Sequence, residues 1–306
     1  MSVPGSVPVL LVTGFLGAGK TTFINSLLLG DHGLRITAIV NDFGSINIDA
    51  ALLDEAAEGV IGLKNGCICC SLQGDLIRVL KLVLSRTPRP ELIVIEASGV
   101  SDPAGIVQSL MDPVIWAQAR LETVIGVVDT PDMPDRKDDP LWRAQLRGSD
   151  VMILSKTAEC APQEVSAARH ALAVQGKKHV FSADEPLPLA ALFIEDDRRR
   201  GRVGPHAQDD GRFVHLEWTH EGVLDLSAFQ VTMSRLAGDL LRCKGFLDFG
   251  DGKGRMLFQL AGNRAALSPA TSDQDTGCAL VLIGERGKFD PQAASRDLDR
   301  LRQQRA

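Results

Sequence analysis

The stretch GFLGAGKTT at residues 14–22 fits the pattern G-x-x-x-x-G-K-[ST] of a phosphate-binding loop. An apolar run from Val9 to Val12 precedes it, as a buried strand would, and residues 22–29 follow with helical character. Strand, loop and helix therefore stand in the order that a nucleotide site needs. A glycine-rich turn that ends in Lys-Thr by chance would require neither the strand nor the helix.

The chemistry of this loop follows from its residue types. Glycines let backbone N–H groups surround phosphate oxygens, Lys20 reaches the β and γ oxygens, and the Thr21 hydroxyl can bind Mg²⁺. The residues expected to bind nucleotide here are Gly14, Gly17, Ala18, Gly19, Lys20, Thr21 and Thr22.

Length and charge narrow the class of protein. At 306 residues the chain is long enough for two domains of roughly 100 to 200 residues each. A net charge of −6 argues against a nucleic-acid partner, which would require a basic surface. No apolar run approaches the length of a membrane span, and the first leads into the phosphate loop instead of a cleavage site. We therefore expect a cytoplasmic protein without a membrane partner.

The first 186 residues alternate short apolar runs with helical segments. This pattern is typical of an α/β fold, in which a mostly parallel sheet carries helices on both faces. After the strand at residues 9–12, further strands are expected near residues 35–40, 60–63, 92–95, 124–128, 151–154 and 180–181.

A change of composition to Pro, Asp, Arg and Gly between residues 185 and 212 indicates a domain boundary. We expect a phosphate-loop domain at 1–186, a linker at 187–211 and a smaller α+β domain at 212–306. In the latter, apolar residues alternate along a strand at 214–218 and recur at spacings of three and four along a helix from Leu226 to Leu240. Three more strands are expected near residues 246, 256–260 and 279–283, and a last helix from Pro291.

Two acidic residues are candidates for the metal-associated carboxylate that nucleotide hydrolysis needs. Glu96 ends an apolar strand, whereas Asp42 lies in a polar, glycine-bearing segment where nucleotide-responsive loops usually lie. The four apolar residues before Glu96 disfavour an ordinary surface acid; for Asp42 the two interpretations are closer. Gly99 leaves the following loop room to approach the γ-phosphate. The expected catalytic residues are Lys20, Asp42 and Glu96, with Mg²⁺ held by Thr21 and directly or indirectly by Glu96.

A cluster of three cysteines, Cys67, Cys69 and Cys70, is the second chemical signal. Thiolates select soft ions such as Zn²⁺, and a following helix N-terminus would lower the thiol pKa values. Burial of one or two cysteines as core residues is the simpler alternative, because free cysteine is often buried. The C-x-x-C spacing of Cys67 and Cys70 leaves a redox role open as well. We favour a transition-metal site at all three.

The chain resembles the CobW family of metallochaperone GTPases. The resemblance rests on residues 14–22, 41–49, 65–70 (NGCICC), 96–103 and 145–156, which cover the whole first domain. Lys244-Gly245-Phe246 resembles the family's C-terminal domain as well. It implies that GTP is the substrate and GDP the product, and that a cargo ion such as Zn²⁺ or Co²⁺ binds the cysteines in response to Mg-GTP. Hydrolysis would then allow release to a client metalloprotein or metal-cofactor pathway enzyme. The resemblance also leaves open that the chain forms a homodimer.

One stretch departs from this family. Guanine-specific GTPases carry Asn-Lys-x-Asp, whose carboxylate accepts hydrogen bonds from guanine, whereas this chain has Ser155-Lys156-Thr157-Ala158. Alanine cannot accept these bonds, although Ser155 and Lys156 remain expected nucleotide contacts. Loss of a hydrogen bond to a charged group costs about 1.5 to 3 kcal/mol, which weakens base discrimination.

Two alternatives from other classes remain open at this point. One is a nucleotide-gated regulatory or scaffold protein whose cysteines hold a structural zinc. The other is an ATP-using phosphate-loop enzyme with a small-molecule acceptor, which Ala158 keeps open.

Overall fold

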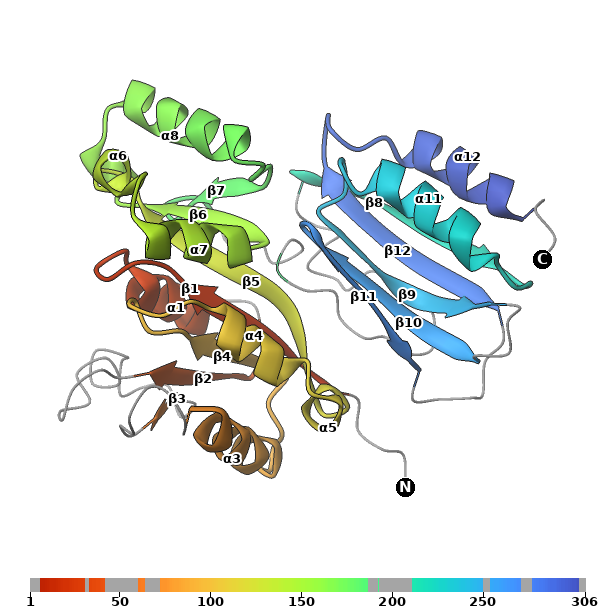
Figure 1. The fold of residues 1–306 in the computed structure, drawn as a ribbon, viewed down its shortest axis with the longest axis horizontal. Coiled ribbons are helices and arrows are strands. Elements are labelled where there is room, and N and C mark those ends of the chain that lie inside the picture. Colours follow the sequence, from red (N-terminus) through yellow and green to blue (C-terminus); the bar gives the residue numbers. More distant parts are fainter. Residues whose placement is uncertain are drawn as a thin grey trace. The chain divides into compact units, whose positions relative to one another are not determined.

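The structure is a computed structural model, and it describes residues 6–30, 33–41, 60–63, 72–186, 192, 211–249, 254–270 and 277–302. Contacts within the chain divide it into two compact units, residues 1–187 and 188–306. Each unit has its own sheet and its own hydrophobic core (Figure 1). Four residues singled out from the sequence, Asp42, Cys67, Cys69 and Cys70, lie outside the described residues.

The first unit is built on a parallel sheet of seven described strands in the order β3-β2-β4-β1-β5-β6-β7. All of its strand pairs are parallel, as the alternation of apolar runs and helices predicted. The strands are β1 (Val7–Thr13), β2 (Ile36–Asn41), β3 (Val60–Leu63), β4 (Leu92–Glu96), β5 (Ala119–Asp129), β6 (Val151–Ser155) and β7 (Val180–Ser182).

Both faces of this sheet are covered, because both sets of alternating side chains on β1 are buried. Val9 and Leu11 point into a core with helices α3, α4 and α5, while Leu10 on the opposite face is equally buried. The helices of this unit are α1 (Lys20–Leu29), α3 (Leu72–Leu84), α4 (Ala104–Leu110), α5 (Pro113–Trp116), α6 (Met133–Arg136), α7 (Pro140–Gly148) and α8 (Pro162–Val174), with a short 3₁₀ turn, η1 (Thr157–Glu159).

The helix α3 has one apolar face. Leu76, Leu80 and Val83 recur at helical spacing and are buried against the strands of the sheet. The helices α6, α7 and α8 contribute to a neighbouring core beside β5 and β6, in which Trp142 and Leu146 of α7 are buried. This packing fixes α7 beside the end of β5.

The second unit is an antiparallel sheet with the order β11-β10-β9-β12-β8. Its strands are β8 (Phe213–His220), β9 (Arg242–Asp248), β10 (Arg255–Ala261), β11 (Arg264–Pro269) and β12 (Cys278–Glu285). Figure 1 shows α11 (Leu226–Leu236) and α12 (Pro291–Leu301) side by side on one face of this sheet, which confirms the predicted α+β class.

Two details of this unit differ from the sequence prediction. The helix α11 ends at Leu236, although the apolar spacing continued to Leu240, because residues 237–239 form a turn; Leu240 is buried after this turn, just before β9. The strand β11 was not predicted, since it alternates between half-buried and exposed residues and contains no strongly apolar run.

Candidate nucleotide site

Parallel strands bring the chemistry of the first unit to one edge of its sheet. The carboxyl ends of neighbouring parallel strands lie at the same edge, and ligands of such sheets bind there. Here β1 leads into the phosphate loop, β4 ends at Glu96, β5 ends at Asp129 and β6 ends at Ser155. Residues separated by more than 130 positions in the sequence therefore meet in one place.

Glycines shape the phosphate loop where no other residue fits. Gly14 and Gly19 have positive φ angles of 150° and 86°, and Gly19 is the N-cap of α1. A Cβ added to Gly14 would lie 2.3 Å from the carbonyl oxygen of Val127 on β5. The loop is thus pressed against the sheet, and α1 begins at Lys20 with its N-terminus facing the loop.

The lysine of the loop is held in place by the loop itself. Its ammonium Nζ lies 3.3 Å from the carbonyl oxygen of Phe15, and the residue is only 7% exposed. A buried ammonium group is stable only when anionic or hydrogen-bonding groups lie beside it. The geometry therefore suits the binding of phosphate oxygens beside Lys20.

Thr21 and Glu96 come together, as the sequence hypothesis for a magnesium site requires. The Thr21 hydroxyl donates a hydrogen bond to Glu96 Oε1 at 3.4 Å, and Glu96 is 4% exposed at the end of β4. A hydroxyl and a carboxylate are hard oxygen donors of the kind that Mg²⁺ prefers. The donor set next to the phosphate loop thus fits Mg²⁺.

The loop that follows Glu96 closes over the phosphate loop at Gly99. A Cβ at Gly99 would lie 2.8 Å from Leu16 Cα and 3.0 Å from Lys20 Nζ. Such close approach explains why this position needs glycine. The segment that follows Glu96 therefore lies against the phosphate loop beside Lys20.

Ser155, the last residue of β6, connects the loop that follows β6 to the phosphate loop. Its hydroxyl lies 2.7 Å from the carbonyl oxygen of Ala18 and 3.1 Å from that of Val128. The hydroxyl has one hydrogen to donate, so it bonds one carbonyl at a time. Ser155 makes this contact although guanine-specific GTPases carry asparagine at this position.

The residues after Ser155 form a rim beside the phosphate loop, on the side where the sequence predicts that the base binds. Lys156 has a positive φ of 54°, and its ammonium pairs with Asp129 Oδ2 at 2.5 Å. The hydrogen bond to Asp129 raises the pKa of Lys156. The Thr157 hydroxyl donates to Asp184 Oδ1 at 3.0 Å, so the loop after β7 is tied to the loop after β6.

Several residues of the site were not singled out from the sequence. Asp129 carried a signal, because it directly follows the apolar run at 124–128, as Glu96 follows its own. Gln145, which contacts the loop at Gly99, carried no signal except that it lies in residues 145–156, a stretch that resembles the CobW family. Asp184 was hidden because only the tertiary structure brings it to Thr157.

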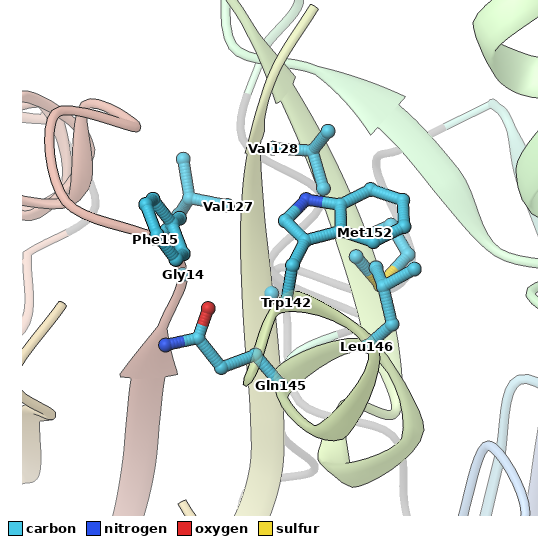
Figure 2. A pocket seen from close by; sticks show the side chains of 9 residues that line it. Gly14, Phe15, Val127, Val128, Trp142, Gln145, Leu146 and Met152 are labelled. Atoms are coloured by element: carbon cyan, nitrogen blue, oxygen red, sulfur yellow. The ribbon is translucent and has the colours of Figure 1, made fainter. Parts of the chain in front are cut away.

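A small cavity lies directly beneath the phosphate loop (Figure 2). Gly14 and Phe15 line it from the loop, Val127 and Val128 from β5, and Trp142, Gln145 and Leu146 from α7. Phe15 is also covered by the Arg136 guanidinium, which lies 4.5 Å from the ring centre. These contacts hold the base of the phosphate loop against α6 and α7.

Fold and site together define a P-loop nucleotide-binding protein with an additional α+β domain. Residues 8–182 match the family model described as CobW/HypB/UreG, nucleotide-binding domain, and residues 213–302 match the cobalamin synthesis protein cobW C-terminal domain. The chain belongs to the CobW/HypB/UreG family of P-loop GTPases. The resemblance found from the sequence is thereby confirmed.

The chain is also similar to individual proteins along most of its length. The chain is 30% identical to a protein named zinc chaperone CobW from Sinorhizobium sp, over 92% of this chain and 93% of that protein. It is also 30% identical to zinc chaperone CobW from Pseudomonas aeruginosa, over 93% and 89%. A solved structure titled Zn(II)-bound YjiA GTPase from E. coli matches with 23% identity and a TM-score of 0.46, covering 98% of this chain and 100% of that one.

In the parts of the chain that the structure describes, no helix is both long enough and apolar enough to cross a membrane. The same described ranges contain no cluster of three or more His, Cys, Asp or Glu side chains arranged to hold a metal ion. The three clustered cysteines lie outside those ranges.

Proposed function

We propose that this chain is a GTP-dependent metallochaperone of the cytoplasm. It binds a transition metal at Cys67, Cys69 and Cys70 and passes the metal to a client metalloprotein or metal-cofactor pathway enzyme when GTP is hydrolysed. The pairing of Thr21 with Glu96 beside the phosphate loop carries the nucleotide half of this proposal. Similarity to relatives named zinc chaperones, along nearly the whole chain, supports the metal half. Zn²⁺ is our first choice of cargo and Co²⁺ the second.

The site residues predicted from the sequence have the following proposed parts in nucleotide hydrolysis. The amides of the loop and Lys20 bind the phosphates, and Lys20 neutralises negative charge that develops as the γ-phosphoryl group leaves. Thr21 and Glu96 would hold Mg²⁺, which supplies further charge neutralisation on the phosphate oxygens when bound. Ser155 and Lys156 position the loop on the base side, and Asp42 is proposed to sense the γ-phosphate.

The link between the two halves is a conformational equilibrium. Because nucleotide can change metal affinity only by binding two states of the protein differently, the γ-phosphate must favour a state in which the thiolates converge. Gly99 supports such a device, because its backbone already lies against Lys20 where the γ-phosphate would bind.

A metal titration tests this coupling. We expect Zn²⁺ to bind more tightly to the protein loaded with a non-hydrolysable GTP analogue and Mg²⁺ than to the GDP form, measured by competition with a chromophoric chelator. Replacing Cys67, Cys69 and Cys70 by serine should abolish this binding and leave nucleotide affinity unchanged. Replacing Cys243 and Cys278 by serine is the matched control, because both are buried in the core of the second unit.

Equal zinc affinity in the two nucleotide states would refute the switch. Zinc that copurifies stoichiometrically and resists chelators in both states would instead identify a structural metal site. Cobalt is tested in the same way by its thiolate absorption.

A further inference from the structure

Helix α7 contacts the loop at Gly99 through a single buried side chain. The amide nitrogen Nε2 of Gln145 lies 3.2 Å from the carbonyl oxygen of Gly99 and 3.2 Å from that of Ser101. The amide has two N–H groups and can donate to both carbonyls at once. Gln145 is 2% exposed, so water does not compete for these bonds.

The same helix contacts this loop at a second point. A Cβ added to Gly148 would lie 2.9 Å from Cγ of Pro103, so α7 and the loop approach as closely as a glycine allows. The loop is thus fixed to α7 at Gly99, at Ser101 and at Pro103. On its other side, Gly99 lies against Leu16 and Lys20 of the phosphate loop. Gly99 is therefore held between the nucleotide site and Gln145.

Burial of the carbonyl oxygen of the Gln145 amide costs free energy of folding. This atom, Oε1, is buried and has no hydrogen-bond partner among the described residues. In Figure 2 this oxygen points toward Gly14 and Phe15, into the small cavity beneath the phosphate loop. An unsatisfied buried acceptor destabilises the fold, and an apolar side chain of similar length would avoid that loss. The cost suggests that the two bonds from Nε2 serve the site rather than stability.

We propose that Gln145 is a positioning residue for the γ-phosphate. By holding the Gly99 carbonyl toward α7, it fixes the plane of the Gly99–Val100 peptide, whose N–H donates to Ser98 Oγ at 3.4 Å, and so keeps Gly99 in place against Leu16 and Lys20. The loop is then organised before GTP binds, and less ordering is needed on binding. This inference rests on the proposed role of the Gly99 loop in contacting the γ-phosphate.

The test compares nucleotides that differ only in the γ-phosphate. We expect Gln145→Met and Gln145→Glu to lower affinity for a non-hydrolysable GTP analogue about tenfold while GDP affinity stays nearly constant, because two neutral hydrogen bonds are lost only from the γ-phosphate loop. Methionine fills the same volume without an amide, and glutamate keeps the length but cannot donate to the carbonyls. Fluorescent nucleotide titration measures both affinities.

Leu172→Met is the matched control. It alters a buried residue of α8 that does not line the cavity beneath the phosphate loop, changes stability through packing alone, and should leave the GTP-to-GDP affinity ratio unchanged. Gly148→Ala provides a second variant should Gln145→Met fail to fold, since pushing Pro103 away from α7 should lower the same ratio.

Three outcomes distinguish the positioning role of Gln145 from the proposed γ-phosphate role of the Gly99 loop. A wild-type ratio well above one that falls in the Gln145 variants supports positioning. A wild-type ratio that survives in all the Gln145 and Gly148 variants overturns the inference alone. Equal wild-type affinities for the two nucleotides would instead overturn the γ-phosphate role of the Gly99 loop.

Discussion

The loop at residues 155–158 departs from the Asn-Lys-x-Asp pattern of guanine-specific GTPases at Ser155 and Ala158, and these two changes have different consequences. Ser155 replaces an amide by a hydroxyl and still bridges to Ala18, because a short side chain suffices when the backbone of β6 lies this close to the phosphate loop. Ala158 has no such compensation at its own position. The loop therefore keeps its attachment to the phosphate loop and lacks its expected guanine-reading carboxylate.

Asp184 is the residue that we expect to supply base discrimination. Its carboxylate accepts a hydrogen bond from Thr157, the residue before Ala158, and it stands in the loop after β7 that borders the same rim. Changing Asp184→Asn should reduce the preference for GTP over XTP about tenfold or more, because a hydrogen bond to a charged group contributes about 1.5 to 3 kcal/mol and an amide can donate to the 2-oxo group of xanthine. Competition of GTP, XTP and ATP against a fluorescent nucleotide measures this preference.

Asp138→Asn is the control for this change, because Asp138 is an exposed acid paired with Arg143 and lies outside the loop. An unaltered GTP-to-XTP ratio in Asp184→Asn would show that another group reads the base. Equal wild-type affinities for GTP and ATP would contradict guanine selection altogether.

At the scale of elements, the junction between β1 and the phosphate loop requires that residue 14 be a glycine, without a Cβ atom. Gly14→Ala should destabilise the protein by more than the cost of a left-handed alanine, which is about 1 to 2 kcal/mol, because its Cβ would also overlap the Val127 carbonyl at 2.3 Å. Gly33→Ala is the matched control, since Gly33 also has a positive φ but has open space around its Cβ position. Urea unfolding followed by circular dichroism compares the two variants, and equal losses of stability would refute the steric argument.

The same scale shows which elements sequence could predict. Strands β1, β4 and β6 are continuous apolar runs followed by polar residues, and each was recovered because burial on both faces leaves an unmistakable pattern. The strand β5 is longer than its apolar run, since Arg120 and Glu122 are buried within it despite their charge. Periodicity cannot reveal a strand whose polar residues find partners only in the folded protein.

At the scale of the whole molecule, nucleotide should stabilise one unit and not the other. A ligand present at 100 times its dissociation constant stabilises the native state by about 2.7 kcal/mol, and the phosphate site lies entirely within residues 1–187. The three tryptophans report on the two units separately, because Trp116 and Trp142 belong to the first and Trp218 to the second.

Thermal unfolding of two variants measures this difference. In Trp218→Phe the fluorescence follows the first unit, and we expect Mg-GTP to raise its midpoint. In the double variant Trp116→Phe and Trp142→Phe the signal follows Trp218, and its midpoint should stay constant. A shift of the same size in both variants would mean that the two units unfold as one.

The sequence by itself determined the phosphate loop, the parallel α/β class and the family, because each of these leaves a local pattern in neighbouring residues. Only the tertiary structure decided which residues meet. It paired Thr21 with Glu96 and Lys156 with Asp129, because parallel strands gather their carboxyl ends at one edge of the sheet whatever their distance in the chain. It paired Gln145 with Gly99 because α7 packs against the loop that follows β4. Patterns along a sequence record the environment of each residue, whereas partners from distant segments are chosen by the fold.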